Sequence, residues 1–333
     1  NYEYIFLNLI AGIIAVFSLD KLHRRSHLVI TALWVFLSYS LVFLALSMIQ
    51  EGNIESIPWK ELEWFGGNAL LVLLAYPLIY IFEKLFGFVS DVTLIELSDT
   101  NQPLLRKLAQ DAPGTFQHSI QVANIAEEVI IRIGGNSLLA RTGALYHDIG
   151  KTNQPAFFIE NQAAGMNPHQ NLDNKESAKI IIDHVTLGVK LARRNKLPEM
   201  LIEFITSHHG TSQAKYFYNT YKNNHPDEEV DPKDFTYPGP PPKSKETSVV
   251  MLTDGIEAAA RALKEKNHEN LQNLIEKMVD DKFETNQLDN AELTLREIRI
   301  FKETILEKLM NIYHVRIAYP EDNNKSGNNQ TKK

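Results

Sequence analysis

The sequence predicts an all-α protein in which transmembrane helices precede a helical soluble domain. Two observations carry this prediction: long uncharged apolar runs crowd the first 90 residues, and apolar residues recur at helical spacing through most of the rest. We expect three transmembrane helices in residues 1–90, a soluble domain in 91–320 and a disordered polar tail in 321–333.

The apolar runs comprise Tyr4–Leu19, Leu28–Ile49 and Trp64–Phe82. The second holds 22 residues and the third 19 without a charge, close to the ~20 that cross a bilayer core. Buried core helices are the alternative interpretation. The first run is short and begins almost at Asn1, which replaces the usual initiator Met. We therefore expect the C-terminal part of a longer protein.

Loop charges predict the orientation of the spans. Lys21, Arg24 and Arg25 lie between the first two runs, whereas the next loop is mainly acidic around Glu55. Positive residues favour the cytoplasmic side. The third span then returns to the cytoplasm, so the sequence predicts a multi-pass protein of the cell (inner or plasma) membrane with a cytoplasmic soluble domain.

In the soluble part, helices are expected at Thr115–Ile133, which ends before two glycines, and at Ser137–His147. Asp173 with Glu176 resembles a capping box that opens a helix to about Asn195. Pro198 fits the first turn of the next helix, which reaches His208. A long proline-rich loop is predicted for 216–246, followed by helices at 246–263, 271–278 and 293–313.

Composition limits the binding partners and the metal ligands that this chain can have. The formal net charge of −7 argues against binding a DNA or RNA duplex, which usually requires a basic patch. The chain has no cysteine, so any metal must be held by nitrogen and oxygen.

Histidines and aspartates form the candidate site. His147-Asp148 stands at a predicted helix end, and other ligand-type residues occur in helical, apolar surroundings. Asp254 follows the apolar run 249–253, where a carboxylate needs a partner such as a metal; the alternative is a solvent-facing position. The whole candidate set is His118, His147, Asp148, His184, His208, His209 and Asp254. Imidazole with carboxylate suits divalent ions, and Asp148 could bridge two of them.

This order of residues resembles the HD-domain metal-dependent phosphohydrolases. Six segments are similar to the seven-transmembrane-receptor HD family in particular: Leu94-Ile-Glu-Leu-Ser-Asp99, Ala112-Pro-Gly-Thr-Phe-Gln-His-Ser119, Gly143-Ala-Leu-Tyr-His-Asp-Ile-Gly-Lys151, Phe158-Ile-Glu-Asn-Gln162, Ser207-His-His-Gly-Thr211 and Tyr237-Pro-Gly-Pro. The resemblance implies hydrolysis of cyclic di-AMP to the linear dinucleotide pApA. The absence of a Gly-Tyr-Pro signature makes cyclic di-GMP less favoured.

The resemblance also implies two divalent ions and a bridging hydroxide as the nucleophile. One ion would be held by His118, His147, Asp148 and Asp254, and the other by His184, His208, His209 and the shared Asp148. Manganese and iron are favoured, and zinc is also compatible with these ligands.

Several roles have alternatives. Lys151 would face a phosphate oxygen as a catalytic residue, or be an exposed lysine at a helix end. The Tyr-Pro-Gly-Pro loop with Lys243 and Lys245 would border the nucleotide pocket, or be a rigid connector with solvated lysines; His169 is not expected to be a ligand. Rival functions are hydrolysis of another nucleotide (cyclic di-GMP, a linear dinucleotide or a guanosine polyphosphate) and a receptor that binds nucleotide without cleaving it. The sequence leaves a homodimer open.

Overall fold

The computed structural model describes residues 2–19, 26–162 and 167–313. The predicted basic loop at 21–25 and the predicted tail at 321–333 lie outside these ranges. The all-α prediction is confirmed: the described residues form helices and 3-10 turns, with one isolated β-bridge between Gln213 and Thr236. The chain divides into two compact units, residues 1–102 and 103–333.

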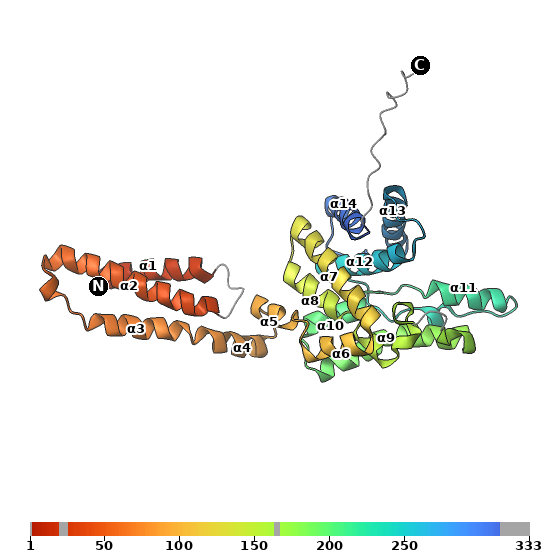
Figure 1. Ribbon diagram of the computed structural model, residues 1–333, viewed down its shortest axis with the longest axis horizontal. Helices are drawn as coiled ribbons and strands as arrows, with labels where there is room; N and C mark the ends of the chain where they lie inside the picture. Colours follow the sequence, from red (N-terminus) through yellow and green to blue (C-terminus); the bar gives the residue numbers. More distant parts are fainter. Residues whose placement is uncertain (1, 20–25, 163–166, 314–333) are drawn as a thin grey trace, which may run out of the picture. The chain divides into compact units, whose positions relative to one another are not determined.

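The first unit contains the apolar helices (Figure 1). Their bounds are α1 Tyr2–Leu19, α2 Ser26–Glu51, η1 Ile54–Ser56, α3 Glu61–Val72, α4 Ala75–Phe86 and α5 Asp91–Leu97. α1 packs along α2, where Ser18 and Thr31 share a 2.7 Å hydrogen bond. α3 packs on α2 through Phe65, whose ring stacks on Tyr39 at 5.3 Å.

The predicted span Trp64–Phe82 is divided between two helices, α3 and α4, rather than lying in one. The i→i−3 bonds from Leu73 and Leu74 tighten the backbone between α3 and α4. Leu28–Gln50 and Glu61–Phe86 remain long and apolar enough to cross a membrane, and little of the latter is buried. Apolar side chains such as Leu71 and Leu85 point outward, which suits a surface that faces lipid.

The second unit is a helical bundle. Its helices are α6 Pro103–Asp111, α7 Pro113–Ile133, α8 Ser137–Tyr146, α9 Asn174–Arg194, α10 Glu199–Ser207, α11 Lys215–Asn224, α12 Lys245–Ala262, α13 His268–Glu284 and α14 Leu295–Ile312. The 3-10 turns are η2 Ile149–Asn153, η3 Pro155–Phe157, η4 Ile159–Asn161, η5 Pro168–Asn171 and η6 Pro232–Phe235. α7 packs against α6, α8, α12 and α14 around a core of aliphatic side chains.

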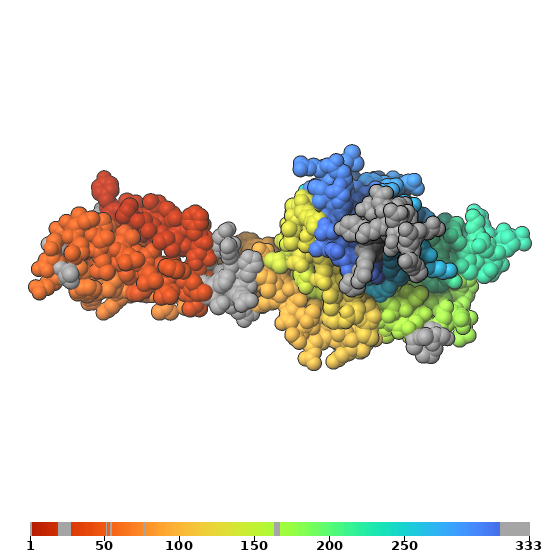
Figure 2. Space-filling model, turned by 45° about the horizontal axis from the view of Figure 1, so that its top comes forward, coloured from red at the N-terminus to blue at the C-terminus, as the bar shows by residue number. Residues whose placement is uncertain are grey.

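Three local predictions need correction. The segment 216–246 is not a continuous loop, since α11 and η6 form within it and pack on α9 through a small core of Ala178, Tyr221 and Phe235. α11 projects from the body of this unit (Figures 1 and 2). Asp173 precedes α9 but accepts no capping hydrogen bond, so the predicted capping box is absent. Pro198 is the N-cap of α10 rather than part of its first turn.

Candidate metal centre

The His147-Asp148 pair lies where α8 ends. His147 keeps a helical backbone as the C-cap, and Asp148 then turns (φ −109°, ψ 15°) into η2. The two side chains therefore leave a buried backbone in different directions. Both are almost fully buried.

The five remaining candidate ligands come from four helices. His118 lies in the middle of α7, His184 in α9 and Asp254 in α12, while His208 caps α10 and His209 follows it. Only the fold brings these helices together, because 136 residues separate His118 from Asp254.

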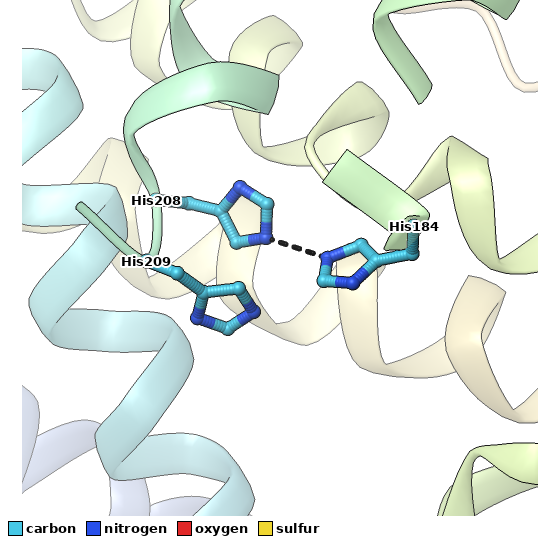
Figure 3. A group of neighbouring side chains, drawn as sticks. All are labelled: His184, His208 and His209. Carbon is cyan, nitrogen blue, oxygen red and sulfur yellow. Dashed lines mark hydrogen bonds between the residues drawn. The ribbon is translucent and has the colours of Figure 1, made fainter. Parts of the chain in front are cut away.

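The seven candidate residues meet in two groups. In the first, His118 Nε2 is 2.8 Å from Asp254 Oδ1, and His147 Nε2 is 3.7 Å from the same oxygen. In the second, His184 Nε2 and His208 Nε2 are 3.1 Å apart, with the ring of His209 beside them (Figure 3). In each group, every residue offers one ligand atom that lies within 4.8 Å of the ligand atoms of the other members. Asp148 belongs to the first group by this measure.

Asp148 lies between these groups. Its Oδ2 is 3.3 Å from His147 Nε2, whereas its Oδ1 is 3.2 Å from His184 Nε2 and 3.6 Å from His208 Nε2. One carboxylate thus presents an oxygen to each side. This arrangement is compatible with the predicted sharing of Asp148 between two metal ions, which stays a prediction.

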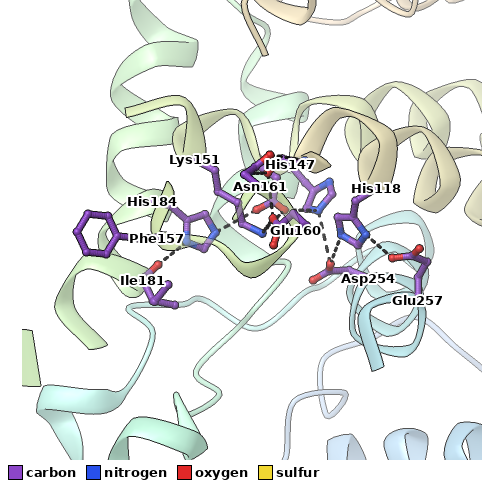
Figure 4. Close-up of polar contacts among 12 residues, drawn as sticks. His118, His147, Lys151, Phe157, Glu160, Asn161, Ile181, His184, Asp254 and Glu257 are labelled. Atoms are coloured by element: carbon purple, nitrogen blue, oxygen red, sulfur yellow. Dashed lines mark hydrogen bonds and ion pairs between the residues drawn. The ribbon is translucent and has the colours of Figure 1, made fainter. Parts of the chain in front are cut away.

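The second ring nitrogen of most of these histidines is held by a neighbouring acceptor. The Nδ1 atoms of His147, His184 and His208 bond the carbonyls of Ala144, Ile181 and Ile205 at 2.6, 2.5 and 2.9 Å. His118 Nδ1 instead bonds the buried carboxylate of Glu257 (Figure 4). Such partners fix the ring so that Nε2 stays free to bind a metal.

His209 is held differently. Its ring stacks on Tyr237, with centroids 4.2 Å apart, and its Nδ1 lies 3.9 Å from Asp254 Oδ2. The Tyr-Pro-Gly-Pro loop therefore contacts the site through Tyr237. Lys245 pairs with Glu297 instead, and neither it nor Lys243 lines the cavity beside the ligands, which favours the alternative of a connector for these two lysines.

The polar atoms of the site fit a cation. His147 Nε2 and Asp148 Oδ1 are both buried, and neither makes a hydrogen bond. Burial alone would lower the pKa of His147, but Asp148 and Asp254 outweigh it and raise that pKa to about 10. In the other group, burial lowers the pKa values of His208 and His209, which keeps these imidazoles neutral. Buried imidazole and carboxylate donors suit divalent ions of the first transition row.

Lys151 is neither exposed nor free. Its Nζ lies 2.7 Å from Asp148 Oδ2 and 2.9 Å from Glu160 Oε1. Burial would lower the pKa of Lys151, but these two carboxylates raise it instead, so the amine stays charged. Glu160 also accepts a 2.9 Å hydrogen bond from the hydroxyl of Thr115.

A cavity of 430 Å³ opens beside the ligands. Lys151, Arg261 and Lys282 give it positive charge, and Met251 and Met278 give it an apolar side. Sequence reasoning missed Arg261, Lys282 and the anchor Glu257. Glu257 lies one turn after Asp254 on α12, so its i+3 spacing was the available signal.

Two family descriptions match the chain. The model described as "HD domain" matches residues 115–301, and "7TM receptor with intracellular HD hydrolase" matches residues 1–90. The chain is 39% identical over 324 residues to "Cyclic-di-AMP phosphodiesterase PgpH" of Bacillus subtilis (strain 168), covering 96% of this chain and 45% of that protein. The protein of the same name from Listeria monocytogenes serotype 1/2a (strain 10403S) is 37% identical, at 94% and 44% coverage.

The solved structure of the L. monocytogenes PgpH HD domain in complex with cyclic di-AMP superposes with a TM-score of 0.62 at 40% identity. The match covers 66% of this chain and 100% of that one. This chain therefore belongs to the HD-domain family, within its seven-transmembrane-receptor branch. HD domains are metal-dependent. The match of residues 1–90 to the 7TM receptor model, together with the apolar helices, indicates a membrane protein. The chain spans about 45% of the length of the two curated relatives.

Proposed function

We propose that this chain is a metal-dependent phosphodiesterase that hydrolyses cyclic di-AMP to the linear dinucleotide pApA. The observation that carries the proposal is the convergence of seven nitrogen and oxygen ligands in two groups around Asp148. The choice of substrate is supported by the two relatives, which are named as cyclic di-AMP phosphodiesterases.

Two divalent ions, manganese or iron, fit this ligand set. His118, His147, Asp148 and Asp254 would hold one ion, and His184, His208, His209 and the shared Asp148 the other. When bound, such a pair supplies an activated water and neutralises charge on a reacting phosphate.

The chain's own cations would position the substrate. Lys151 is fixed by Asp148 and Glu160 beside the ligands, so its charge can meet a phosphate oxygen without reorganisation. Arg261 and Lys282 line the same cavity and balance the second phosphate of a dianionic ring. The membrane helices would hold this domain at the cytoplasmic face of the cell membrane.

Product chromatography tests the substrate assignment. The full chain, purified in detergent and loaded with manganese, is incubated separately with cyclic di-AMP and cyclic di-GMP. We expect pApA from the first and clearly slower conversion of the second. Equal or faster cleavage of cyclic di-GMP contradicts the assignment, and binding without turnover favours the receptor hypothesis.

A further inference from the structure

A second cavity adjoins the cavity of the metal centre. It measures 460 Å³, and Ile159 and Glu160 line both cavities. Phe158 forms part of its wall and ties it to the site, since its ring lies 5.7 Å from that of His184 and 5.0 Å from Lys151 Nζ. A ligand at the metal centre can therefore extend past Ile159 into this space.

The wall of the second cavity is aromatic and ordered. Phe157, Tyr216 and Phe217 line it together with the ring of His169. His169 contacts Phe157 at 5.2 Å and Phe217 at 5.0 Å between centroids, and its Nε2 bonds the Phe157 carbonyl at 2.9 Å. η3 and η5 thus build one aromatic surface with α11, which is distant from them in sequence. Figure 4 shows Phe157 beyond His184, at the end of the site opposite Glu257.

Exposed apolar side chains gather at this cavity. Six large ones are more than a third exposed in the described part of the second unit, and two of them, Ile159 (84%) and Tyr216 (74%), line this cavity. Neither contributes to the core. Apolar groups concentrated at the rim of a cavity are usually covered by a ligand.

Two carboxamide side chains, Gln162 and Asn167, line the cavity together with Glu160. The Asn167 oxygen already accepts a 3.0 Å hydrogen bond from the backbone N–H of His169, so Gln162 is the carboxamide considered for recognition. The carboxamide nitrogen of Gln162 makes one long bond, of 3.5 Å, to the Phe157 carbonyl. A carboxamide offers a donor and an acceptor side by side, the pattern that pairs with the N6 and N7 edge of adenine. Aromatic rings with carboxamide side chains at their edge therefore fit a planar purine better than a sugar or a phosphate.

We propose that this aromatic cavity binds one nucleobase of the substrate, with an adenine edge paired to Gln162. The inference rests on the proposed function, since it requires a phosphodiester at the metal centre whose attached nucleoside passes Ile159. It assigns base recognition to Tyr216 and Gln162, which lie outside the ligand set.

Steady-state kinetics of the full chain with cyclic di-AMP tests the site. Tyr216→Ala should raise KM about tenfold, the loss typical of one base–aromatic stack, while kcat stays within about twofold. Tyr216→Phe keeps the ring and should restore KM. Phe283→Ala removes an exposed ring from α13 that does not line this cavity and serves as the matched control. The manganese-induced rise in Tm should persist in every variant, which excludes loss of the fold.

A second variant tests the edge contact. Gln162→Glu replaces the donor with an acceptor and should lower the preference for cyclic di-AMP over cyclic di-GMP by about tenfold. An unchanged KM in Tyr216→Ala, or equal changes in Tyr216→Ala and Phe283→Ala, overturns this site while leaving the proposed function intact. A wild-type chain that cleaves no cyclic dinucleotide overturns the proposed function, and this inference with it.

Discussion

Asp148 is the residue on which both metal positions depend in the proposed site. Its two oxygens face opposite ligand groups, and its side chain is buried. Asp148→Asn preserves size but removes the charge that two cations share, so the variant should lose most of the manganese-induced rise in Tm. Ligand binding stabilises a folded protein by about 2.7 kcal/mol at a hundredfold excess over Kd, which sets the scale of the loss.

Hydrolysis should fall by orders of magnitude in the same variant, because nucleophile activation and charge neutralisation both need the ions. Thermal melts with and without manganese, circular dichroism of the metal-free protein and turnover measure these effects. Asp183→Asn, one position before His184, is the control and should change little. Two bound ions with near-normal turnover in Asp148→Asn would show that this carboxylate is not shared.

Glu257 is expected to act as a positioning residue for His118. It is buried, bonds His118 Nδ1 and pairs through its other oxygen with Arg261 at 2.7 Å. Glu257→Gln removes the charge behind the imidazole, so manganese affinity should fall about 10–100-fold. Metal titration followed by Tm measures this effect independently of activity.

Glu127→Gln provides the comparison for Glu257. Glu127 also pairs with an arginine at 2.7 Å, but on the outer face of α7. If both substitutions leave manganese affinity unchanged, Glu257 has no positioning role.

Residue type decided which parts of the site could be predicted from sequence. Histidine and aspartate in apolar helices stand out, so the seven candidates could be chosen from the sequence, and the structure brings them together. Their role as metal ligands stays a prediction. Glu257 and Lys282 look like ordinary charged residues of amphipathic helices. The i+3 spacing from Asp254 was the one local signal for Glu257, whereas the place of Lys282 depends on how α13 packs on α12, which no local pattern reveals.

At the scale of elements, one glycine allows the metal-site segments to approach. A Cβ on Gly150 would lie 1.9 Å from the carbonyl oxygen of His184, a backbone atom that cannot move aside. Gly150→Ala should therefore push η2 away from α9 and lower the free energy of unfolding by about 1–3 kcal/mol or more. Denaturant unfolding of the metal-free protein measures this loss.

Gly188→Ala is the graded comparison in the same contact. Its Cβ would first meet a side-chain methyl of Ile205 at 2.9 Å, which can shift, so the loss should be smaller. The reverse order of stabilities would contradict this account of the η2–α9 packing.

The long helices were predictable because their apolar spacing is regular, as in α7, α12 and α14. α11 was missed because its sequence is polar and lies among prolines, and its stability comes from Tyr221 packing on Phe235 and Ala178. The break at Leu73 was missed for the opposite reason, since an unbroken apolar run gives no sign of a turn.

At the scale of the whole molecule, the proposed function requires the second unit to face a cytoplasmic nucleotide. The orientation stays a prediction from the charges around Arg24 and Glu55. Because the chain has no cysteine, single cysteines give an unambiguous readout. Ser26→Cys stands at the start of α2, and Ser56→Cys ends the exposed turn η1.

An impermeant thiol reagent applied to intact cells should label the cysteine at position 56 and spare the one at position 26. Permeabilised cells should show both cysteines labelled, which controls for their reactivity.

The expected labelling pattern follows from the cost of translocating clustered positive residues. This cost keeps the first loop inside, so the second loop lies outside. Because the third span returns the chain, residues from about Gly87 onward then lie inside. Labelling at 26 but not at 56 on intact cells would place the catalytic unit outside, where no cytoplasmic cyclic di-AMP could reach it.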